Sequence, residues 1–216
     1  MVVRQRVIAQ LRNVAEELAS GVADGLGIAT LPEPLSLLGK RPKAEVDRSD
    51  FLSLLVRPGS LGIRSRKVAV VVADGIDGLA ALRIHQGLVG QGAIPRFVGI
   101  KLGAVQSATG DPIDVEVTLE AAPSVLWDAS VFVDGQEATD TLTQSGHALE
   151  FLKDQYRHAK PILLMGSANA LLDEVKISAA LPDGAADPAL VQLASEDLDV
   201  ALTPFISALT NHRMFE

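Results

Sequence analysis

The chain contains no cysteine, has one Trp and one Tyr, and lacks long apolar runs. The missing cysteine excludes disulfides, thiolate metal sites and cysteine nucleophiles, and is neutral about the compartment. The scarcity of aromatic rings leaves few surfaces on which nucleic-acid bases could stack. The apolar runs are far shorter than the roughly 20 residues that a membrane helix needs. We therefore expect neither a nucleic-acid partner nor a membrane partner.

Charge is distributed unevenly along the chain, whose formal net charge is −8. Residues 1–66 contain ten Lys and Arg against seven Asp and Glu, whereas the remainder contains nine against twenty. An acidic main part does not neutralise phosphates, which again argues against nucleic-acid binding. The N-terminal stretch MVVRQRVIAQL does not have the layout of a signal peptide. We expect a cytoplasmic protein.

The first third of the chain is predicted to be an amphipathic helix followed by an extended arm. Residues 3–20 place apolar side chains at helical spacing, and the glycines of GVADGLGI are suited to ending the helix. The rest of residues 1–29 offers nothing for this helix to pack on. Residues 30–66 contain four prolines and no sustained period, which is typical of a linker arm that docks on another surface.

Residues 67–216 show strands that alternate with helices. The predicted strands are KVAVVVAD, IPRFVGI, residues 129–133 and PILLM. VQSATGDPIDVEVTL is predicted to be a polar hairpin or an excursion from the sheet, and LVQLAS a short edge strand. The predicted helices are LAALRIHQGLVGQG, residues 137–158 and DVALTPFISALTNHRMF. This alternation predicts a doubly wound, three-layer α/β/α sandwich with a mainly parallel sheet.

Ligands of doubly wound sheets bind where strands end, so the turns after Ala73, Val133 and Met165 are the candidate sites. The first turn, ADGIDG, contains Asp74 and Asp77 where a phosphate cradle needs open amides and no fixed anions. We interpret it as a strand-to-helix turn in which Asp77 caps the helix. The second turn, VDGQE, carries two carboxylates and is also interpreted as a helix-capping turn.

The third turn lies within PILLMGSANALL, where Ser167 follows Gly166. It lacks the flanking glycines of a G-x-S-x-G nucleophile elbow. The four histidines lie in predicted helices or at their ends, with no metal-binding spacing, so neither a base for Ser167 nor a metal site is expected. We predict that Tyr156 is a half-buried helical residue. We also predict a solvated acidic face, formed by Asp187, Glu196, Asp197 and Asp199, with Asp199 capping the last helix.

Several long stretches resemble the C-terminal domain of the large-subunit catalases. They are RKVAVVVADGIDGLAALRIHQGLVGQGAIPRFVGIKLGAV, PSVLWDASVFVDG, HALEFLKDQYRHAKPILLMG and FISALTNHRMFE. Upstream, LRNVAEELASGVADGLGIATLPEP is similar to the last helix of a catalase core, and LSLLGKRP to the start of the linker that follows it. The resemblance implies the division 1–29 core helix, 30–66 linker arm and 67–216 tail domain.

The resemblance implies a flavodoxin-like tail domain, related in fold to PfpI-type proteases and class I glutamine amidotransferases. In PfpI-type relatives a Cys-His pair follows the strand that corresponds to PILLM, and those positions fall here on Gly166 and Ser167. The partner Glu falls on Ala80. All three catalytic positions are therefore expected to be lost together, and replacing Ser167 is expected to change stability slightly and no chemistry.

The resemblance also implies a function: a non-catalytic accessory domain that stabilises a parent catalase and its homotetramer. Haem and the peroxide-cleaving residues would belong to the core of that parent, so no cofactor is expected in this chain. The expected partners are the catalase core, neighbouring subunits and unfolded client proteins. Two alternatives remain open: a stand-alone PfpI-type hydrolase or glyoxalase-like enzyme acting through Ser167 or Asp74, and a flavin or nucleotide module.

Overall fold

The computed structural model describes residues 2–35, 62–193 and 198–214. The chain divides into two compact units, Met1–Pro58 and Gly59–Glu216, and each unit is described here by itself. The predicted arm falls largely on residues 36–61, which lie outside the described residues. The division into 1–29, 30–66 and 67–216 stays a prediction, although Ile63 is buried in the core of the second unit.

The first unit is a pair of helices, α1 (Val2–Leu11) and α2 (Glu16–Gly25), which pack on each other through Ile8, Ala19 and Ala23. The prediction of a single helix over 3–20 with no partner is therefore wrong. The helix breaks at Asn13, whose side-chain amide donates to the Leu35 carbonyl at 2.7 Å. The break lets the two helices fold together and bury apolar surface that one straight helix would leave exposed.

The second unit is built on a six-stranded sheet in which every pairing is parallel. In spatial order the strands are β5 (Val117–Thr118), β2 (Ile94–Gly99), β1 (Lys67–Val71), β6 (Ala129–Phe132), β7 (Ile162–Met165) and β8 (Leu190–Leu193). Counted along the chain this order is third, second, first, fourth, fifth and sixth, so the winding reverses between β1 and β6. That reversal marks the place where doubly wound proteins bind ligands.

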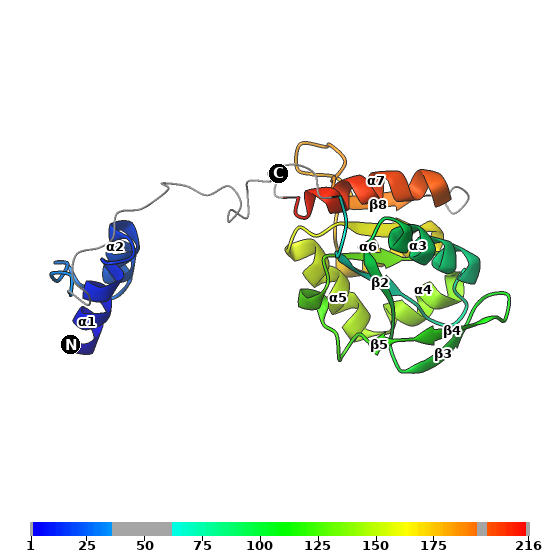
Figure 1. The fold of residues 1–216 in the computed structure, drawn as a ribbon, viewed down its shortest axis with the longest axis horizontal. Coiled ribbons are helices and arrows are strands. Elements are labelled where there is room, and N and C mark those ends of the chain that lie inside the picture. The colour runs from blue at the N-terminus through cyan, green and yellow to red at the C-terminus, as the bar shows by residue number, and fades with distance from the viewer. Residues whose placement is uncertain (1, 36–61, 194–197, 215–216) are drawn as a thin grey trace. The chain divides into compact units, whose positions relative to one another are not determined.

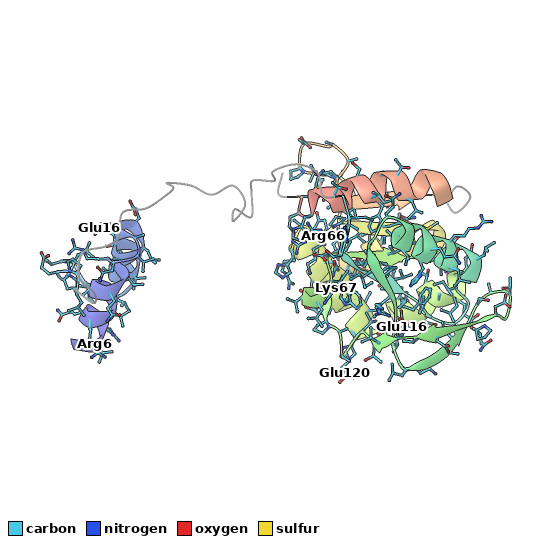
Figure 2. All side chains as sticks on the ribbon, in the orientation of Figure 1. Arg6, Glu16, Arg66, Lys67, Glu116 and Glu120 are labelled. Carbon is cyan, nitrogen blue, oxygen red and sulfur yellow. The ribbon has the colours of Figure 1, made fainter. Side chains whose placement is uncertain are left out.

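Helices cover both faces of the sheet (Figure 1). One layer holds α3 (Gly78–Gly90) and α7 (Leu198–Asn211), which contact each other. The other holds α4 (Gln136–Thr143), α5 (Gly146–Arg157) and α6 (Ala170–Val175). The predicted three-layer sandwich is confirmed, and side chains fill the space between the sheet and the helices (Figure 2). The core is mainly aliphatic because β1, β6 and β7, which are rich in Val, Ile and Leu, are buried on both faces.

Smaller predictions are confirmed or corrected by local features. The expected hairpin consists of β3 (Gly103–Gln106) and β4 (Pro112–Val115), which pair antiparallel. The expected helix over 137–158 is two helices, because Ser145 begins α5 by accepting a hydrogen bond from the Ala148 amide at 3.3 Å. Two short 3₁₀ turns, η2 (Ser124–Leu126) and η3 (Gly166–Asn169), precede β6 and α6. β8 forms the predicted edge strand.

Candidate functional site

The turns after β1 and β6 meet at the point where the winding reverses. The Asp77 amide donates to the Asp134 carbonyl at 2.8 Å, which ties the two turns together. Gly135 has a φ of +146°, and a Cβ placed there would lie 2.5 Å from the Gly75 carbonyl oxygen. Only glycine allows so close an approach of two backbones. The turns after β1 and β6 therefore pack directly against each other where the winding reverses.

The Asp134 carboxylate lies between the second and third turns. Its Oδ1 accepts hydrogen bonds from the Gly135 amide at 2.8 Å, the Ser167 amide at 2.8 Å and the Ser167 hydroxyl at 2.7 Å. Backbone amides that converge in this way form the kind of cradle in which an enzyme stabilises a developing oxyanion. In this protein the cradle holds a carboxylate from the protein itself.

Gly166 stands first in the turn after β7, at the position expected from the resemblance to correspond to the nucleophile. Its φ of +52° lies in the left-handed region. A Cβ added to Gly166 would lie 2.1 Å from the Asp134 Cγ and 2.2 Å from its Oδ2. The volume in which a nucleophilic side chain would begin is thus filled by the Asp134 carboxylate.

The Ser167 hydroxyl is held in place from three sides. It donates to Asp134, accepts from the Gly135 amide at 3.0 Å and lies 3.0 Å from the Thr139 hydroxyl. Because the single hydroxyl proton of Ser167 is directed at Asp134, Thr139 is the donor in the last contact. These contacts join the second turn, α4 and the third turn.

Ala80, the third position expected from the resemblance, lies in the first turn of α3 and is 2% exposed. Its amide donates to the Asp77 side chain at 2.9 Å, which confirms that Asp77 caps this helix. The methyl group of Ala80 belongs to the hydrophobic core. The structure therefore places Gly166 and Ser167 beside each other in one turn and Ala80 at the start of a different helix.

The histidines do not contribute to this site. The His85 ring stacks on Phe97 with the ring centroids 4.9 Å apart. The His212 Nε2 lies 2.9 Å from the Asp128 Oδ1, immediately before β6, whereas Ser167 follows the opposite end of β7. His147 and His158 are exposed near the two ends of α5. Within the described residues, no group of three His, Asp or Glu side chains could hold a metal ion.

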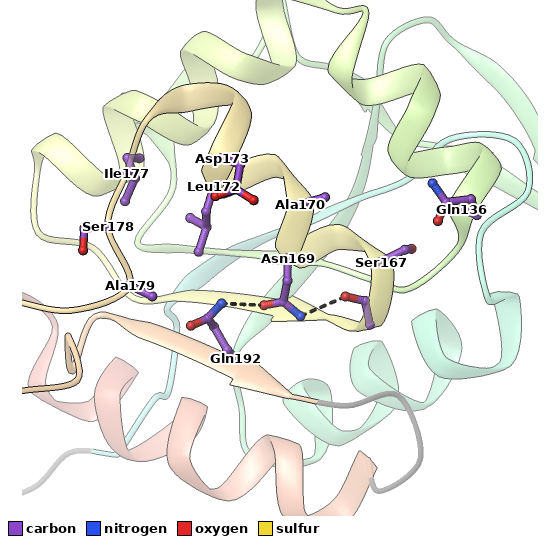
Figure 3. Close-up of a pocket in the computed structure, with 11 residues that line it drawn as sticks. Gln136, Ser167, Asn169, Ala170, Leu172, Asp173, Ile177, Ser178, Ala179 and Gln192 are labelled. Atoms are coloured by element: carbon purple, nitrogen blue, oxygen red, sulfur yellow. Dashed lines mark hydrogen bonds between the residues drawn. The ribbon is translucent and has the colours of Figure 1, made fainter.

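A groove of about 700 Å³ opens beside the third turn (Figure 3). Amide side chains dominate the part of it nearest Ser167: the Asn169 Nδ2 donates to the Gly166 carbonyl at 2.9 Å, and the Gln192 Nε2 to the Asn169 Oδ1 at 2.8 Å. Of the described residues in the lining, Asp173 is the charged one. The sequence did not indicate this amide network, since it joins η3 to β8 across 23 residues.

Two further predictions concern Tyr156 near the end of α5 and the acidic residues that follow β7. Tyr156 is half-buried on that helix, as predicted, and burial together with a hydrogen bond to Asp187 raises its pKa. The prediction that Asp187 lies on a solvated face is wrong, because it is 8% exposed and accepts from the Ala189 amide at 2.8 Å. Glu196 and Asp197 lie outside the described residues. Asp199 lies inside α7, which begins at Leu198, so the predicted capping position is not the one it occupies.

The fold is that of a known class of α/β domain. The crystal structure of a two-domain protein from Anabaena variabilis, containing DJ-1/ThiJ/PfpI-like and ferritin-like domains, is similar with a TM-score of 0.59 and 17% sequence identity. The similarity covers 67% of this chain and 48% of that protein. It bears out the predicted flavodoxin-like, PfpI-related fold and, at this identity, concerns the fold alone.

The family follows from sequence. Residues 64–216 match the model of the C-terminal domain found in long catalases, and the chain belongs to this family. Catalase HPII of Pseudomonas putida is 32% identical over 95% of this chain and 27% of its own length, and catalase HPII of Mycobacterium avium is 32% identical over 99% and 30%. The chain thus spans less than a third of the length of these relatives. No helix among the described residues is long and apolar enough to cross a membrane.

Proposed function

We propose that this chain is the non-catalytic accessory part of a long catalase, and that it stabilises the subunit and its oligomer. The activity of the parent is then the dismutation of hydrogen peroxide to water and oxygen, with haem held in its core domain. The observation that carries the non-catalytic part of the proposal is the Asp134 carboxylate, which occupies the place of a side chain at Gly166.

The hydrogen bonds around this carboxylate support the proposal. A working elbow needs a nucleophile on the turn and open amides for the oxyanion. Here Gly166 supplies no nucleophile, and the amides of Gly135 and Ser167 already bind Asp134. The Asp134 carboxylate and its donors read as a structural clamp that joins β6 to β7 beyond the ends of both strands.

The helical pair in the first unit supports a role in assembly. Val3, Val7, Val14 and Leu18 are large apolar side chains that the unit leaves exposed, Val14 to 72% and Val3 to 66%. Apolar groups in this number on a small unit indicate a contact with another protein surface. We assign that surface to the catalase core or to a neighbouring subunit.

The experiment compares the full-length parent with a form that lacks residues 64–216. We expect similar peroxide turnover per haem and a much shorter half-life at elevated temperature for the shortened form. A parent carrying Ser167→Ala is the matched control, and both its turnover and its half-life should stay close to those of the unmodified parent. Equal half-lives of the full-length and shortened proteins at matched haem content would refute the stabilising role.

The same exposed apolar side chains support a client-protecting role as a second part of the proposal. The isolated chain should reduce light scattering from a heat-denatured model enzyme. A variant with Val3, Val7 and Val14 changed to Ser is the control that removes the surface and should reduce that effect. No difference between the two chains would refute a role for this surface.

A further inference from the structure

A pocket of about 340 Å³ lies at the connection from α5 to β7. It is at the end of the sheet where the strands begin, opposite the end that holds the clamp. It is lined by Arg157, His158, Ala159 and Lys160 from this connection, by Val125 from η2 and by Arg213 from the segment after α7. Arg66 and Lys67, labelled in Figure 2, lie at the same end of the sheet, at the start of β1.

The lining of this pocket is basic in a domain that is otherwise acidic. From residue 67 onward the chain has nine Lys and Arg against twenty Asp and Glu, yet three of the nine line this single pocket. Among the described residues, no carboxylate belongs to the lining. A basic concave surface in an acidic domain attracts anions, because the local potential there opposes that of the remaining surface.

Lys160 is the central residue, since it is a cation that is only 3% exposed. Its Nζ donates to the Ser124 carbonyl at 2.6 Å, and within the described part of the chain it forms no ion pair. Burial and the neighbouring Arg213 cation lower the pKa of Lys160 from 10.5 to about 8. A buried ammonium without a counter-ion is costly, and a bound anion would remove that cost.

The two carboxylates that attract Lys160, those of Asp128 and Asp154, already have other partners. The Asp128 Oδ1 lies 2.9 Å from the His212 Nε2 and 3.7 Å from the Arg66 Nη1. Asp154 pairs with Arg157 at 2.6 Å. These two acids attract Lys160 only from a distance, so the protein itself supplies no close anion among the described residues.

We propose that this pocket binds a small oxyanion, a phosphate or a carboxylate group, between Lys160 and Arg213, with Arg157 at its rim. Lys160 supplies a point charge with N–H donors, and the guanidinium groups supply the planar forks that fit tetrahedral and planar oxyanions. Val125, which is 77% exposed, forms an apolar wall that suits an anion carried on an organic molecule.

The test is a ¹H–¹⁵N NMR titration of the full chain with sodium phosphate and, separately, with sodium acetate, at constant ionic strength. Saturable shifts confined to the amides of Ala159, Lys160 and Arg213 with either anion are expected. Which of the two anions saturates at the lower concentration then identifies the preferred headgroup. Shifts that do not saturate with either anion would overturn the proposal.

Two variants and a control locate the site. Arg213→Gln and Lys160→Met should each weaken binding at least about tenfold, because each removes a hydrogen bond to a charged group. Arg83→Gln, an exposed residue of α3 outside the pocket, should leave binding unchanged. Far-ultraviolet circular dichroism shows whether each variant is folded. Equal weakening in Arg83→Gln and Arg213→Gln would reduce the effect to general charge and refute the site.

Discussion

The two ends of the parallel strands carry opposite charges in different surroundings: the Asp134 carboxylate is half-buried, whereas the Lys160 ammonium is buried. Beyond the ends of β6 and β7, the Asp134 carboxylate accepts three hydrogen bonds at one oxygen. Before the start of β7, the Lys160 ammonium donates to one carbonyl and lies near another cation. At the end of the strands where this fold usually binds ligands, the chain's own donors satisfy the carboxylate, whereas at the opposite end Lys160 has no counter-ion among the described residues. Substitutions around Asp134 should therefore lower the free energy of unfolding, whereas removal of the Lys160 ammonium should raise it.

The largest effect is expected from Gly166→Ala. The new Cβ would lie 2.1 Å from the Asp134 Cγ, in a backbone conformation with a φ of +52°. Overpacking costs about 1–3 kcal/mol and the left-handed conformation about 1 kcal/mol more, so the free energy of unfolding should fall by about 3 kcal/mol. Urea denaturation measures it.

Gly184→Ala separates the two causes of this loss. Gly184 has a φ of +87°, but a Cβ there would meet nothing within 4 Å. This variant should therefore lose only the conformational part, about 1 kcal/mol. If both substitutions cost the same, the Asp134 carboxylate does not occupy the space beside Gly166.

The opposite sign is expected from Lys160→Met. Between pH 8 and 10.5 the unfolded chain holds a proton that the native Lys160 has released, so the stability of the unmodified protein should rise with pH over this window. Removing the ammonium should raise the free energy of unfolding at pH 7 by up to about 3 kcal/mol and flatten that rise. The Ser124 carbonyl keeps the Gln155 donor at 3.1 Å, so no acceptor is left unpaired.

Urea denaturation at pH 7 and pH 10 in phosphate-free buffer checks this prediction. Lys101→Met, at an exposed position, is the matched control and should change stability by no more than about 0.5 kcal/mol at either pH. A loss of stability in Lys160→Met at pH 7 would mean that the native protein stabilises the ammonium. The contrast between Asp134 and Lys160 would then disappear.

A smaller loss is expected from Asp134→Asn, which keeps the shape of the side chain and removes its charge. Hydrogen bonds to charged groups contribute about 1.5–3 kcal/mol, so weakening the three at Oδ1 should cost about 2 kcal/mol in total. Asp173→Asn, in the lining of the neighbouring groove, is the control and should cost less than about 0.5 kcal/mol. Thermal unfolding of both variants measures the difference, and equal melting temperatures would contradict the clamp.

Which of these features the sequence could predict depends on how far apart the interacting residues are. The buried strand 67–71 was predictable because it is a continuous run of β-branched and apolar residues. The cap at Asp77 was predictable because its partner, the Ala80 amide, is only three residues away. The break at Asn13 and the burial of Asp187 were not, since Asn13 bonds to the Leu35 carbonyl and Asp187 to Tyr156, which are both distant in sequence.

The same reasoning applies to the site. That Gly166 carries no nucleophilic side chain follows from its residue type. The clamp could not be predicted, because Asp134 and Ser167 are 33 residues apart and their contact depends on β6 pairing with β7. The basic pocket could not be predicted either, because Lys160 and Arg213 are distant in sequence and α7 brings Arg213 to the pocket.

The smallest effect is expected from Ser167→Ala, which tests whether the turn after β7 has a structural role alone. The Gly135 amide keeps its bond to Asp134 at 2.8 Å, while Thr139 loses one acceptor and Asp134 one donor. The free energy of unfolding should fall by about 1 kcal/mol. Ser178→Ala, in the same groove, loses two exposed hydrogen bonds, one donated to the Ala180 carbonyl and one accepted from the Ala180 amide, and should cost less. Esterase, peptidase and glyoxalase assays should give equal rates for unmodified and Ser167→Ala chains; a rate that disappears with the hydroxyl would make this turn a catalytic site after all.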